Sequence, residues 1–129
     1  MTLNPDCVRD VLLTIEKQNF GEHLKINQLC EFLSEYSLEE ISYTCLKLNE
    51  GNLLEILTTT YTRQPMPGIS LIKDITYQGH EFLSNIRPAT VWEKTKNIAE
   101  KVGSHSIDIL SKISVGVLTE LIKQNMLMS

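Results

Sequence analysis

The segment Leu53–Leu83 reads LLEILTTTYTRQPMPGISLIKDITYQGHEFL and decides the fold. Its first part, residues 53–61, is rich in Leu, Ile and Thr, which is typical of a strand. Pro65, Pro67 and Gly68 then predict a turn, because neither a strand nor a helix can continue through them. Residues 69–75 predict a returning strand. We therefore expect a β-hairpin with an irregular tip of about six to eight residues.

A helix is expected directly after the hairpin. Thr76 can cap a helix that runs to about Ile86 and buries Phe82, Leu83 and Ile86. Gly79 lies inside this helix, where glycine costs about 1 kcal/mol relative to alanine. Close backbone packing is therefore expected at Gly79.

Three helices are predicted before the hairpin. Asn4 caps the first, with Pro5 at its first position. A short extended segment, residues 24–26, precedes a second helix capped by Asn27. Ser37–Glu40 is a capping box that starts the third helix, and Gly51 ends it in a left-handed conformation. Each helix is expected to turn one apolar face inward. These faces comprise Val8, Val11, Leu12 and Ile15 in the first helix, Leu29, Phe32, Leu33 and Tyr36 in the second, and Leu38, Ile41, Cys45 and Leu48 in the third.

The remaining chain is predicted to be a helical tail. Pro88 interrupts the chain, and Thr90–Glu93 forms a second capping box for a helix that ends at Gly103. Ser104 or Ser106 can cap a final helix. Its apolar stripe comprises Ile107, Leu110, Ile113, Val117 and Leu121.

The order of helix, short strand, two helices, hairpin and helix is that of a winged-helix protein. We therefore predict an α+β, mostly α, winged-helix-like domain over residues 1–87: a three-helix core, a hairpin wing and a fourth helix. Residues 88–129 would form the tail, an oligomerisation element.

The composition indicates a soluble protein of the cytoplasm. The chain has 129 residues, 42% of them hydrophobic, and a net charge of −4. An acidic chain is unlike a general nucleic-acid binder. Three dispersed cysteines suit a reducing compartment. The start lacks the features of a signal peptide, and four charges interrupt the most apolar segment, so no membrane association is expected.

Four segments together resemble a family of small phage- and prophage-associated proteins, domain of unknown function 2513. These are residues 3–12 (LNPDCVRDVL), 36–40 (YSLEE), 72–83 (IKDITYQGHEFL) and 86–94 (IRPATVWEK). The resemblance covers about residues 1–110. It implies a bacterial or phage origin, hence the cytoplasm of a bacterial host, and a winged-helix-like core, but it implies no mechanism.

No enzyme, cofactor or metal site is predicted. His23, His80 and His105 are dispersed and belong to no metal-binding or catalytic motif. His80 beside Glu81 could suggest acid–base chemistry, but a histidine on a helix surface explains it more simply. The cysteines are expected to pack in the core.

Duplex DNA is the partner that the fold suggests. A winged helix reads DNA with its third helix and its wing. The outward face of the third helix, however, carries Glu39, Glu40 and Glu50 against Lys47 alone, which disfavours phosphate binding. The candidate DNA contacts of this alternative are Tyr43, Lys47, Thr60, Tyr61, Arg63 and Gln64.

A protein partner fits the sequence better. The apolar stripe of the last helix is too long for so small a core to cover, so it is expected to pair with a second chain. Folding back onto the domain is the alternative. The candidate surface comprises Trp92, Ile107, Leu110, Ile113, Val117 and Leu121. We thus predict a non-enzymatic interaction or regulatory protein, a homodimer through its C-terminal helices, that binds a host or phage protein.

Overall fold

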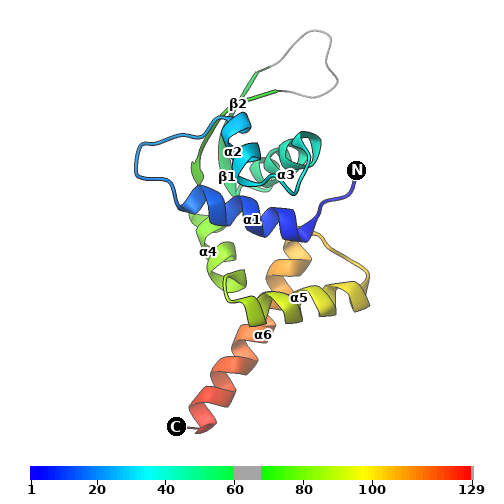
Figure 1. The fold of residues 1–129 in the computed structure, drawn as a ribbon. Helices are drawn as coiled ribbons and strands as arrows, with labels where there is room; N and C mark the ends of the chain where they lie inside the picture. Colours follow the sequence, from blue (N-terminus) through cyan, green and yellow to red (C-terminus); the bar gives the residue numbers. More distant parts are fainter. Residues whose placement is uncertain (60–67, 129) are drawn as a thin grey trace. The chain divides into compact units, whose positions relative to one another are not determined.

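A computed structural model describes residues 1–59 and 68–128. In these ranges the protein has six α-helices and one antiparallel sheet of two strands, which confirms the predicted mostly helical α+β class. The elements follow in the order α1 (Pro5–Glu16), α2 (Ile26–Phe32), α3 (Leu38–Glu50), β1 (Leu54–Thr59), β2 (Gly68–Ile75), α4 (Tyr77–Ile86), α5 (Ala89–Val102) and α6 (Ile107–Met128) (Figure 1).

The chain divides into two compact units, Met1–His80 and Glu81–Ser129. The boundary lies inside α4, a few residues before the end of the domain predicted at residue 87. No helix of the described ranges combines the length and the hydropathy that crossing a membrane requires.

Side-chain caps start α1 and α3 of the first unit as predicted. Asn4 Oδ1 accepts a hydrogen bond from the Asp6 amide at 3.0 Å, and Ser37 Oγ accepts one from the Glu40 amide at 3.1 Å. The Glu40 carboxylate in turn accepts from Asn4 Nδ2 at 2.8 Å, so the two helix starts are tied together. The predicted inner face of α1 is confirmed by the burial of Val8, Val11, Leu12 and Ile15.

The hairpin pairs β1 with β2 in antiparallel register, from Leu54 opposite Ile75 to Thr59 opposite Gly68. Its tip, residues 60–67, lies outside the described residues. The predicted extended segment before α2 is present as an isolated bridge. Leu24 exchanges two backbone hydrogen bonds with Ile72, of 3.1 and 2.7 Å, beside the hairpin.

The start of α4 confirms two predictions. Thr76 Oγ1 accepts from the Gly79 amide at 3.0 Å and donates to the Asn52 carbonyl at 2.7 Å. A Cβ added to Gly79 would collide with the Leu53 carbonyl oxygen and the Ile75 side chain. The close backbone packing expected at Gly79 is therefore real.

The expected burial of Phe32 and Leu38 is wrong, since their side chains are 63% and 53% exposed. Both lie at helix ends, Phe32 as the last residue of α2 and Leu38 as the first of α3. A helical period cannot decide orientation where the helix stops. Tyr36, which was also predicted to face inward, is half-buried. The remaining predicted inner positions are buried: Leu29, Leu33, Ile41, Cys45 and Leu48.

Two predicted helix boundaries of the first unit are also wrong. The N-cap of α2 is Lys25, and Asn27 lies within the helix. Gly51 ends α3 with an ordinary φ of −79°, and the left-handed residue is Asn52, with φ of 63°. Asparagine is one of the few residues besides glycine that adopt this conformation readily, so it can make the reversal.

In the second unit, α5 and α6 pack against each other. The buried residues of these two helices are Val91, Trp92, Thr95, Ala99, Leu110 and Ser114. Gly103 ends α5 with φ of 83°, and Ser106 Oγ caps α6 by accepting from the Ile109 amide at 3.2 Å; both were predicted. The second capping box is wrong. Helix α5 starts at Ala89 with Pro88 at its N-cap, which places Thr90 inside the first turn.

Candidate functional site

A groove of about 360 Å³ runs between α5 and α6. Helix α6 has 22 residues and α5 has 14, so α6 extends beyond the packed region toward the C-terminus (Figure 1). The groove is lined by Lys94 and Ile98 of α5 and by Ile113, Gly116, Val117, Glu120, Leu121 and Gln124 of α6.

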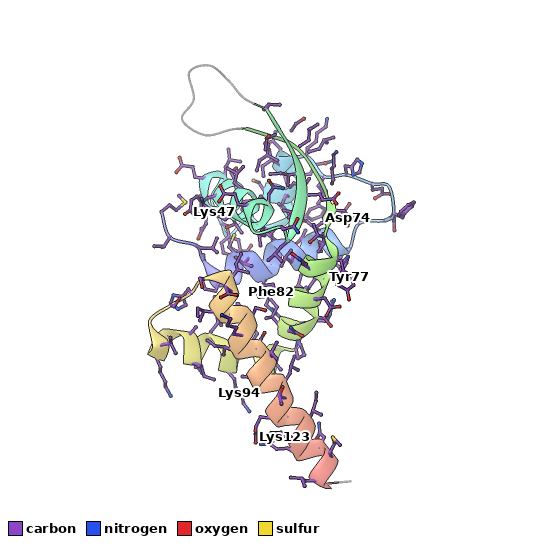
Figure 2. The ribbon with its side chains drawn as sticks, turned by 180° about the vertical axis from the view of Figure 1, so that it is seen from behind. Lys47, Asp74, Tyr77, Phe82, Lys94 and Lys123 are labelled. Atoms are coloured by element: carbon purple, nitrogen blue, oxygen red, sulfur yellow. The ribbon has the colours of Figure 1, made fainter. Side chains whose placement is uncertain are left out.

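The lining joins apolar walls to a charged rim. Ile98, Val117 and Leu121 offer aliphatic surface, while Lys94 and Glu120 bring opposite charges. Figure 2 shows Lys94 on α5 beside α6, with Lys123 further along α6. An aliphatic surface with a few charges at its edge is suited to a protein segment rather than to a small polar ligand.

Beyond the groove, α6 exposes further large apolar side chains. Met126 is 71% exposed and Leu127 is 87% exposed. Single exposed apolar residues are ordinary, but several on one helix beside an apolar groove indicate an interaction surface. The other members of this exposed set are Val115 and Ile122.

The predicted partner surface is divided by the structure. Trp92 and Leu110 are buried, 3% and 0% exposed, so they offer no free surface in this conformation. Ile107, Ile113, Val117 and Leu121 are half-buried, and the last three line the groove. The sequence pattern did not identify Ile98 and Gly116 as part of this surface. Ile98 lies on α5 rather than on the predicted stripe of α6, and Gly116 has no side chain to mark it.

The candidate DNA contacts are only partly described. Tyr43 and Lys47 lie on α3, and Lys47 Nζ is 2.9 Å from Glu50 Oε2 and 5.5 Å from the centre of the Tyr43 ring. The hydrogen bond to Glu50 raises the pKa of Lys47 above its usual value. This lysine is thus already paired with a carboxylate. The remaining contacts, Thr60, Tyr61, Arg63 and Gln64, lie outside the described residues.

A hollow of about 440 Å³ brings two of the dispersed histidines together. His23 and His80 line it with Glu55 and Asp74, and His23 Nδ1 lies 3.3 Å from the Lys73 carbonyl oxygen. The sequence suggested only the neighbours His80 and Glu81. Within residues 1–59 and 68–128, no three His, Cys, Asp or Glu side chains are placed to hold a metal ion.

The buried cysteines are poor nucleophiles. Burial raises the pKa of the Cys7 thiol to about 11, and burial likewise raises the pKa of Cys45. A thiol attacks as the thiolate, which at neutral pH is scarce at such values. Cys7 and Cys45 therefore act in packing, as predicted.

Comparison with known proteins adds a family. The model of the family described as "Hypothetical protein (DUF2513)" matches residues 2–106. An uncharacterized protein of Haemophilus influenzae is 27% identical over 124 residues, which cover 95% of this chain and 99% of that protein. No solved structure gives a significant match. The family match ends directly before α6, which begins at Ile107.

Proposed function

The chain belongs to the DUF2513 family, and we propose that it is a non-enzymatic interaction protein that associates with a second copy of itself through α5 and α6. The observation that carries this proposal is the apolar groove between these helices, continued by exposed apolar side chains on α6. Burial of apolar surface is the dominant favourable contribution to most protein–protein association.

The first unit would bind another protein, from the host or from a phage. Phe20 is fully exposed in the loop after α1, and Phe32 and Leu38 are exposed around the turn between α2 and α3. Exposed aromatic side chains are frequent anchors of protein interfaces. The resemblance of four segments to phage- and prophage-associated proteins supports such an origin.

We also infer a winged-helix arrangement for this unit. Its support is the order of α1, α2, α3 and the hairpin, together with the bridge between Leu24 and Ile72, which adds a third extended segment beside the two strands. This arrangement keeps duplex DNA as the alternative partner, with α3 as the recognition helix. The pairing of Lys47 with Glu50 weighs against it.

Self-association is tested by measuring the molar mass of the full-length protein by light scattering over a range of concentrations. We expect a dimer for the wild type and a shift toward monomer for Val117→Asp and Ile98→Asp, which place a carboxylate in the groove. Val102→Asp is the matched control, since Val102 is 62% exposed at the end of α5 and lies outside the groove lining.

Helix content measured by circular dichroism separates lost association from lost folding. Ile98 is 39% exposed, so its replacement should leave the fold intact. A wild type that stays monomeric would refute the proposal. The DNA alternative is tested by titrating a mixed-sequence duplex at low salt; salt-sensitive binding that Lys47→Ala weakens would favour it.

A further inference from the structure

Gly116 is at an unusual place for a glycine. It lies in the interior of α6, where glycine is less favourable than alanine. A Cβ added there would meet none of the described atoms within 4 Å, so the chain's own packing does not require glycine. Gly116 also lines the groove. A position that a side chain does not fill lets another helix approach closely, because the distance between packed helices depends on the side chains at the contact.

The charges of α6 are arranged about Gly116 with opposite signs at matching distances. Lys112 precedes it by four residues and Glu120 follows it by four. Residues four apart lie on the same face of a helix, so Lys112, Gly116 and Glu120 form one row. Further out, Asp108 and Lys123 continue the alternation, eight residues before and seven residues after. Lys112 Nζ lies 3.0 Å from Asp108 Oδ2. Both side chains are more than 70% exposed, which leaves room for each to contact a second partner.

From this pattern we infer that the partner of α6 is α6 of a second copy, antiparallel to the first and crossing it at Gly116. The inference rests on the proposed self-association and specifies its geometry. A two-fold axis at Gly116 places Lys112 of each chain opposite Glu120 of the other, and Asp108 close to Lys123. In a parallel pair each of these charges would face its own copy and repel it.

Charge reversal tests the orientation in the full-length protein. Lys112→Glu alone and Glu120→Lys alone should each raise the dimer dissociation constant about tenfold, because two attractive pairs become repulsive. The double variant should recover most of the wild-type affinity. The carboxylate that it introduces at position 112 still faces Asp108 within the same helix, so a recovery can come only from pairing between chains.

Cross-linking provides a second readout that does not depend on affinity. Two variants, Lys112→Cys and Glu120→Cys, are made with tags of different length, and both also carry Cys30→Ser. They are mixed and treated with a short bis-maleimide. The antiparallel pair predicts a mixed product of the two variants. Two copies of residue 112 would lie about 12 Å apart along the helix axis, so products within one variant should be weak.

The outcomes distinguish this inference from the proposed function. A dimer with charge recovery and the mixed product supports both. A dimer without recovery, or one that gives products within single variants, overturns the antiparallel geometry and leaves self-association standing. A protein that remains monomeric at all concentrations overturns both.

Discussion

Gly79 lies where α4 passes directly against the backbone of Leu53. The Leu53 carbonyl accepts a hydrogen bond from the Thr76 amide at 3.1 Å, which holds it in place. Any side chain at position 79 would have to displace this carbonyl or the Ile75 side chain. The absence of a side chain at Gly79 thus allows the start of α4 to pack directly against the hairpin.

We expect Gly79→Ala to lower the free energy of unfolding by about 1–3 kcal/mol, as overpacking of a filled site does. This loss should outweigh the helix propensity that alanine adds, about 1 kcal/mol. Urea denaturation followed by circular dichroism measures it. Gly51→Ala is the control, since the φ of Gly51 is −79° and its added Cβ would come no closer than 3.4 Å to the Lys47 carbonyl oxygen. Equal losses in the two variants would contradict this account.

The starts of the helices differ in how they are capped. At α3 the Ser37 hydroxyl accepts from the Glu40 amide. At α5 the residue in the capping position is Pro88, which has no polar side chain. The two capping-box sequences of the chain, Ser37–Glu40 and Thr90–Glu93, therefore have different roles.

Ser37→Ala and Thr90→Ala form a matched pair for testing this difference. Ser37→Ala should lower the free energy of unfolding by about 1 kcal/mol, because it removes an N-cap. Thr90→Ala should change it by less than about 0.5 kcal/mol, since Thr90 is exposed within the first turn of α5. Thermal and urea denaturation measure both, and a larger loss for Thr90→Ala would show that it caps α5 after all.

The proposed dimer links stability to concentration. A folded state that associates is stabilised by mass action, whereas a monomer is not. The exposed apolar part of α6 would be covered only in the pair. We therefore expect the thermal midpoint of the wild type to rise with protein concentration.

Val117→Asp should remove this dependence, and Val102→Asp should keep it. Differential scanning calorimetry at several concentrations provides the comparison. A midpoint that is independent of concentration in the wild type, while light scattering shows a dimer, would mean that the dimer leaves folding unaffected and does not use α6 as proposed.

The family and the local structure could be read from residues close together in the chain. The caps at Asn4, Ser37 and Thr76 depend on hydrogen bonds that span two or three residues. The buried stripe of α1 follows from the helical period, and the strands follow from composition and from the Pro and Gly residues between them. Even the close packing at Gly79 could be predicted, because a glycine inside a helix needs a physical reason.

Tertiary packing decided which of the predicted apolar residues remain accessible. Trp92 and Leu110 are in the same tail as Val117, yet the first two are buried and Val117 lines a groove. Whether a side chain is covered depends on the angle and length of the helix packed against it, and a period of 3.6 residues carries no information about either. The sequence by itself therefore determined the family, the elements and the apolar stripe of α6, whereas only the packing of α5 on α6 decided where that stripe is open to a partner.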